Sequence, residues 1–172
     1  MKIPFRLNEG IYFEDTGNIL LWNDTLENIK EIDNPELGAN GSVLKWFDKL
    51  CFAGQRVNVT ISVNEYHNTN GILEFVNFEQ GRNDPHGVYQ KFSMLFKEHL
   101  GEPSETSDDG FGRPTALWTI NDLQVIIGIG ERFMEYEIFG IHKGKPFWTL
   151  KNNDRITQPL QKRRVTWFSK FF

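Results

Sequence analysis

Residues 84–101 read DPHGVYQKFSMLFKEHLG, and this stretch predicts the main helix of the fold. Its apolar residues recur at intervals of three and four, which places them on one stripe of a helix. Asp84 can cap the first turn, Pro85 suits the first helical position, and Gly101 supplies a stop signal. We therefore expect a helix over residues 85–100 that packs its apolar stripe against the rest of the fold.

Strands are predicted on both sides of this helix. Residues 57–63 alternate apolar and polar side chains, which is the period of a half-buried strand. The other expected strands span residues 43–52 and 72–78 before the helix, and residues 115–120, 123–129, 133–141 and 147–150 after it. Polar or glycine-containing turns separate neighbouring strands, as at residues 121–122 and 130–132.

The order of these elements defines the fold class. A second, shorter helix is predicted over residues 25–32, where Asp24 and Glu27 resemble a capping box. Each helix precedes three strands, and strands in runs are typical of antiparallel α+β folds rather than of a doubly wound sheet. We expect a single α+β domain over residues 1–150, with about six antiparallel strands, the helices on one face of the sheet, and a surface loop at residues 102–113.

Composition and targeting signals indicate a cytoplasmic protein. The chain has 172 residues, enough to bury a substantial core, and 14% of them are aromatic. The first residues lack the apolar run of a signal peptide, and no stretch approaches the roughly 18 apolar residues that a membrane helix needs. A single cysteine cannot form an internal disulfide, which agrees with a reducing compartment.

The last part of the chain carries a charge opposite to the rest. Residues 151–172 contain six basic residues and one acid, a net charge of +5, and since the whole chain carries −4, residues 1–150 carry −9. The aromatic side chains of this basic extension are Trp167, Phe168, Phe171 and Phe172. Docking of the extension on the acidic domain would bury four rings and is the favoured interpretation; contact with a membrane surface or with a partner is the alternative.

No catalytic signature is present in the sequence. It lacks the G-x-S-x-G elbow, the phosphate-binding loop, the H-E-x-x-H zinc motif and paired C-x-x-C motifs. Gly128 and Gly130 begin like a dinucleotide-binding fingerprint, but a strand follows, so we expect them to allow a turn and close packing of strands. Cys51 lies in an apolar segment and is expected to be a small buried residue. We therefore assign no catalytic residue, no metal ligand and no cofactor.

Charged side chains gather at the strand expected over residues 133–141. Arg132 precedes it, and Glu135 and Glu137 share one face of it with Phe139. We interpret this cluster first as a solvent-facing patch, next as an acidic recognition surface, and last as a carboxylate pair for acid–base chemistry.

A second polar group lies in the loop before the strand at residues 72–78 and at the start of the main helix. Glu65 and His67 belong to the loop, and Asp84 and His86 to the helix start. These residue types are suitable metal ligands, but their wide spacing leaves the distances between them undefined. Solvated side chains are therefore the favoured interpretation.

Two classes of function follow from these observations. The favoured one is a small non-enzymatic domain that binds a protein through Arg132, Glu135 and Glu137 or through the loop that contains Glu65 and His67. An immunity or inhibitor protein that neutralises a basic partner is its concrete form. The alternative is a small metal-dependent hydrolase that uses the histidines and carboxylates named above. The acidic body opposes binding to nucleic acid, and the sequence does not define an oligomeric state.

Overall fold

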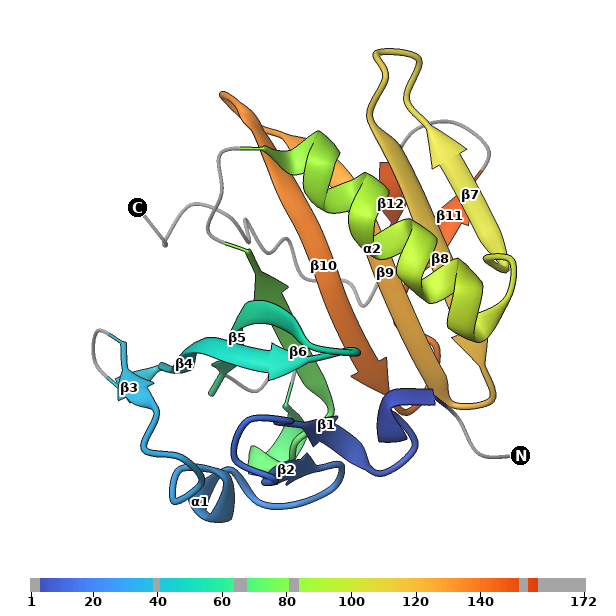
Figure 1. The fold of residues 1–172 in the computed structure, drawn as a ribbon. Helices are drawn as coiled ribbons and strands as arrows, with labels where there is room; N and C mark the ends of the chain where they lie inside the picture. The colour runs from blue at the N-terminus through green and yellow to red at the C-terminus, as the bar shows by residue number, and fades with distance from the viewer. Residues whose placement is uncertain (1–3, 39–40, 64–67, 81–83, 152–154, 158–172) are drawn as a thin grey trace.

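The computed structural model describes residues 4–38, 41–63, 68–80, 84–151 and 155–157 (Figure 1). Within this part of the chain, eight strands form one sheet in the order β3-β4-β5-β6-β10-β9-β8-β7, and each neighbouring pair is antiparallel. The strands are β3 (Glu36–Leu37), β4 (Val43–Cys51), β5 (Gln55–Ser62), β6 (Phe75–Glu79), β7 (Glu105–Asp108), β8 (Pro114–Ile120), β9 (Leu123–Glu131) and β10 (Glu135–Lys143).

The sheet consists of two four-stranded meanders that meet at their last strands. One meander is β3 to β6, the other is β7 to β10, and β6 pairs with β10 at Gly140, Ile141 and His142. A helix precedes each meander, α1 (Leu26–Ile29) and α2 (Pro85–Leu100). The α+β class is thus present, but each helix precedes four strands rather than the predicted three, and the prediction of about six strands was too low. The additional strands, β3 and β7, are short edge strands, and β7 lies inside the predicted surface loop at residues 102–113.

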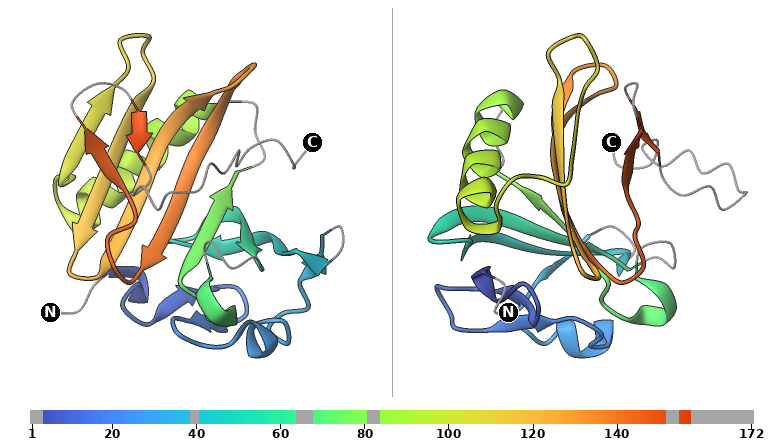
Figure 2. Two further views of the ribbon diagram at one scale, coloured as in Figure 1. Left: turned by 180° about the vertical axis from the view of Figure 1, so that it is seen from behind. Right: turned by 90° about the vertical axis from the view of Figure 1, so that its right-hand side faces the viewer.

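The main helix begins and ends where the sequence predicts. The Asp84 carboxylate accepts a hydrogen bond from the backbone N–H of Gly87, and Gly101 follows the last turn with a φ of 87°. Val88, Phe92 and Phe96 are buried against β8, β9 and β10. Figure 2 shows α2 on one side of this half of the sheet, with the C-terminal hairpin on the other.

The short helix differs from its prediction at both ends. α1 covers residues 26–29 rather than 25–32, and its N-cap is Thr25, whose hydroxyl accepts from the N–H of Asn28. Asp24, the predicted cap, instead accepts from the N–H of Thr25 and the side chain of Asn28. The turns after Ile29 tighten to i→i+3 hydrogen bonds, so the regular helix ends early.

Aromatic rings fill the space between α2 and the sheet. Phe139 of β10 lies 4.7 Å from both Phe78 and Phe92, measured between ring centroids. Phe52 and Phe96 pack on the same ring at 5.6 and 5.8 Å. These rings come from β6, β10, α2 and the turn between β4 and β5, so the cluster joins both meanders to the helix.

A smaller apolar cluster covers the opposite face of the sheet. Leu117, Ile126 and Phe75 pack there against Trp148, which precedes the two-stranded hairpin of β11 (Thr149–Lys151) and β12 (Arg155–Thr157). Gln124 holds this segment, because its side-chain oxygen accepts from the N–H groups of residues 147 and 148 at 2.6 and 2.9 Å. The predicted strand at residues 147–150 overlaps β11. The rest of the basic extension, residues 158–172, lies outside the described part of the chain.

The N-terminal segment adds a layer that the sequence analysis did not anticipate. A short hairpin of β1 (Gly10–Tyr12) and β2 (Ile19–Leu21) buries Ile11 and Leu20 in the main core. The indole N–H groups of Trp22 and Trp46 donate to backbone carbonyls of other segments, each at 2.6 Å. The Trp22 bond, to Leu7, lies within the N-terminal segment, whereas the Trp46 bond, to Ile32, joins β4 to the turn after α1.

Candidate functional site

The acidic strand predicted at residues 133–141 is β10, and its start lies beside the start of α2. Glu135 contacts His86, with 2.9 Å between the carboxylate Oε2 and the imidazole Nε2. Glu137 is half-buried, and its Oε1 accepts from the backbone N–H of Gln80, just before the helix. Both glutamates therefore contact residues at or just before the start of α2. Arg132 lies exposed in the turn that precedes β10.

The other predicted candidates, Glu65 and His67, lie outside the described residues. Of their proposed companions, Asp84 caps α2 and His86 pairs with Glu135. In the part of the chain that the structure describes, no three His, Cys, Asp or Glu side chains are close enough together to hold a metal ion. The metal-site hypothesis consequently stays a prediction.

The strongest surface feature is a set of large apolar side chains at the tips of two hairpins. Phe111 lies at the tip between β7 and β8 and is 80% exposed. Phe133 and Met134 lie at the tip between β9 and β10 and are 91% and 76% exposed. Both tips project from the same end of the sheet (Figure 1). Exposure of this extent is unusual for such residues, because each leaves apolar surface in water.

Arg113 joins the two tips. Its guanidinium pairs with Asp109 of the first tip and with Glu131 at the end of β9, and its side chain is only 14% exposed. It also lies over the ring of Phe111, 5.1 Å from the centroid. Burial works against ionisation of Asp109, but hydrogen bonds from the Phe111 N–H and from Arg113 outweigh it and lower the pKa of that carboxyl. The tips are therefore held by charge-assisted contacts.

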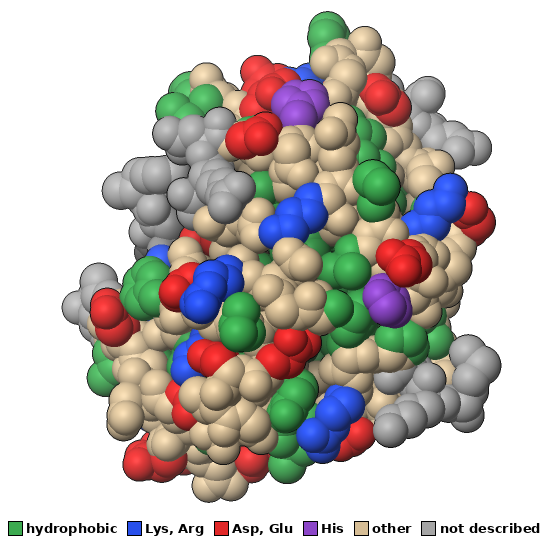
Figure 3. All heavy atoms as spheres, in the orientation of Figure 1, with side chains coloured by type: hydrophobic (Ala, Val, Ile, Leu, Met, Phe, Trp, Pro, Cys, Tyr) green, Lys and Arg blue, Asp and Glu red, His purple; other side chains and the backbone are tan. Residues whose placement is uncertain are grey.

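We call this end of the sheet the hairpin face, made of residues 108–113 and 131–135. Its acids are Asp108, Asp109, Glu131 and Glu135, and its bases are Arg113 and Arg132, so its net charge is −2. Elsewhere, on the side that carries α2, acidic and basic side chains lie near one another with apolar groups between them (Figure 3).

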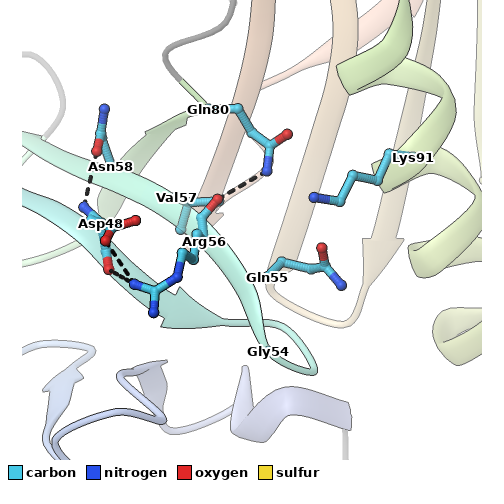
Figure 4. A pocket seen from close by; sticks show the side chains of 8 residues that line it. All are labelled: Asp48, Gly54, Gln55, Arg56, Val57, Asn58, Gln80 and Lys91. Carbon is cyan, nitrogen blue, oxygen red and sulfur yellow. Dashed lines mark hydrogen bonds and ion pairs between the residues drawn. The ribbon is translucent and has the colours of Figure 1, made fainter.

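A separate hollow lies between β5 and α2. Eight residues line a space of about 380 Å³, and Figure 4 shows them: Asp48, Gly54, Gln55, Arg56, Val57, Asn58, Gln80 and Lys91. The side chains of Gln55, Gln80 and Lys91 point toward one another, while Arg56 turns toward Asp48. Most of the described side chains that line this cavity are polar or charged. None of them was a candidate site residue on the basis of the sequence.

The structure also places the residues considered for catalysis. Cys51 is buried, and burial raises the pKa of its thiol, so the reactive thiolate is disfavoured. A Cβ atom at Gly130 would lie 2.3 Å from the ring of Tyr136, and one at Gly128 would contact Thr115. Close packing of strands therefore explains both glycines.

The sequence around two of the exposed apolar residues, Phe111 and Met134, contains local features that indicate their exposure. Phe111 stands between two glycines in an acidic turn, where a core residue is not expected. Met134 lies two residues after the predicted turn at residues 130–132, but the alternation of the strand assigned it to a sheet face. The turn is longer than predicted, since β10 begins at Glu135.

Comparison with protein-family models, with curated proteins and with solved structures finds no match to this chain. Among the residues that the structure describes, no helix has the length and apolar character required to cross a membrane. The class is therefore defined by the fold alone, an α+β protein with an eight-stranded antiparallel sheet.

Proposed function

We propose that this chain is a non-enzymatic protein-binding domain whose hairpin face engages a basic partner, in the manner of an immunity or inhibitor protein. The observation that carries the proposal is the exposure of Phe111, Phe133 and Met134 beside four acids. Interfaces concentrate their binding energy in a few large apolar side chains, and a rim of charge selects the partner.

Burial of these side chains would supply part of the binding free energy of a complex. A fully buried Phe or Met contributes roughly 1.5–3 kcal/mol, so Phe133 and Met134 together would contribute about 3–6 kcal/mol. The hairpins cost little to order on binding, because Arg113 already bridges Asp109 and Glu131.

Charge supports a basic rather than an acidic partner. The hairpin face carries −2 within a body, residues 1–150, that carries −9. Complementary charge accelerates association and disfavours acidic competitors, while the exposed rings provide affinity after contact.

The experiment is a calorimetric titration of the protein with the basic proteins encoded beside it in its genome. We expect one of them to bind, and the double substitution Phe133→Ser/Met134→Ser to weaken that binding by about 30-fold or more. Leu37→Ser, on the distant edge strand β3, is the matched control because Leu37 is also exposed, and it should leave the affinity unchanged. Absence of binding to every candidate, or equal weakening by both variants, would contradict the proposal.

A further inference from the structure

The hairpin face leaves large apolar side chains in water, and nothing in the described part of the chain covers them. Phe111, Phe133 and Met134 are 80%, 91% and 76% exposed, and the two tips that carry them project from the same end of the sheet (Figure 1). The other large exposed apolar side chains of the described residues are spread over β2, β3, β4 and α2. Grouping at one end of the sheet is typical of a surface that is covered in the working state of a protein.

The end of the chain has the composition that complements this surface. Residues 158–172 read QPLQKRRVTWFSKFF, with four basic residues and no acidic one, a charge of +4. Four aromatic residues fall within the last six positions of this segment. The hairpin face carries −2 and exposes a phenylalanine on each tip, so the two surfaces match in the sign of their charge and in their apolar character.

The extension is long enough to reach the hairpin face of its own molecule. Thr157, the last described residue, pairs with Thr149. Thr149 follows Trp148, whose ring lies 3.2 Å from the position of a Cβ atom built on Gly140 of β10. The path through these contacts to Met134 is at most about 40 Å, of which the six-residue rise along the strand is about 20 Å. Fifteen extended residues span about 50 Å, so the tether permits the contact.

We propose that residues 158–172 dock on the hairpin face of the same molecule and act as a tethered competitor of the basic partner. This inference rests on the proposed function of that face, and it adds a means of regulation. A flexible tether of this length gives a millimolar effective concentration, so a contact with a dissociation constant of about 0.1 mM keeps the face covered in about nine of ten molecules. A partner then finds the face free in about one molecule in ten, and its apparent affinity falls about tenfold.

The test uses a nitroxide spin label at Ser169→Cys in the full-length protein. Ser169 lies among the aromatic residues of the extension, and the native Cys51 is buried, so the label reacts at one position. In ¹H–¹⁵N spectra, with the chemically reduced label as reference, we expect the amide resonances of residues 110–113 and 131–135 to lose about half or more of their intensity. The resonances of β3, at the far edge of the sheet, should keep theirs.

Two substitutions and one mixture control this measurement. In the spin-labelled chain, Phe133→Ser/Met134→Ser should restore the intensities, and Leu37→Ser, also at an exposed apolar residue, should not. A mixture of spin-labelled protein with ¹⁵N-labelled protein that lacks the nitroxide detects contact between molecules. Equal broadening in that mixture would assign the contact to a second copy and overturn docking within one molecule. Broadening spread over the whole surface, or no broadening of the hairpin face, would overturn it as well.

These spectra need no partner, so this proposal and the proposed function can fail separately. A basic partner that binds in calorimetry, without broadening of the hairpin face, would leave the proposed function standing and overturn the tethered competitor. Broadening without any basic partner would support docking and contradict the proposed function. When both hold, Trp167→Ser/Phe168→Ser should tighten partner binding by about tenfold, and an unchanged affinity would overturn the competition.

Discussion

His142 makes the stability of this protein depend on pH, and the size of the effect follows from its surroundings. It lies on β10, is only 7% exposed, and stacks on the ring of Phe147 at 5.1 Å with Trp148 edge-on at 6.1 Å. Its Nδ1 has no hydrogen-bond partner among the described residues. Burial lowers the pKa of His142 from 6.5 to about 4, because nothing compensates the charged imidazolium for lost water.

The sign of the effect follows from the proton balance. Below pH 6.5 the unfolded chain binds a proton at His142 while the native state does not, so the free energy of unfolding falls as the pH falls. The loss reaches about 2–3 kcal/mol between pH 7.5 and pH 4.5, and it levels off below pH 4, where both states are protonated.

Urea unfolding, followed by tryptophan fluorescence at pH 7.5, 6, 5 and 4.5, measures this loss. His142→Phe keeps a ring that can stack on Phe147 and removes the titration, so its stability should decline by about 2–3 kcal/mol less over the same range. Subtracting the unfolding free energies of the two proteins cancels the contributions of groups that titrate in both. An identical pH dependence in the wild type and in His142→Phe would refute the reasoning.

Two further outcomes are expected. Asp33→Asn should lower the free energy of unfolding by about 1–3 kcal/mol, because Asp33 accepts hydrogen bonds from Thr16, Asn18 and Lys49. Burial opposes ionisation of Asp33, but these bonds lower its pKa, so the wild type should also lose stability below pH 4 more steeply than the variant in acid titrations. Deletion of residues 160–172 should lower the melting temperature by several degrees if the basic extension docks on the domain; an unchanged melting temperature in calorimetry would exclude docking.

Local patterns predicted much of the fold. Residues 85–100 form a helix with the predicted cap, because periodicity and capping residues act within a few turns. The strands at residues 43–52 and 123–129 were also identified, since their apolar content and flanking turns are local properties. The edge strands β3 and β7 were missed, because such short segments carry no clear alternation and form strands only where a neighbouring strand offers hydrogen bonds.

Local patterns identified only part of the candidate sites. The cluster of Arg132, Glu135 and Glu137 was recognised as a polar interruption of an apolar strand. The exposure of Phe133 was not predicted, because the alternation of side chains assigns a residue to a face of the sheet without showing where the strand begins. Lys91 and Gln80 belong to different elements, so no sequence spacing indicates that their side chains line one hollow.

The sequence by itself determined the α+β class, the main helix and the division of charge between residues 1–150 and 151–172. Only the tertiary structure decided the pairing of β6 with β10, the contact of His86 with Glu135 and the burial of His142. The physical reason is the range of the interactions. Periodicity shows which side of an element is apolar, whereas its packing partner depends on the free energy of the whole core.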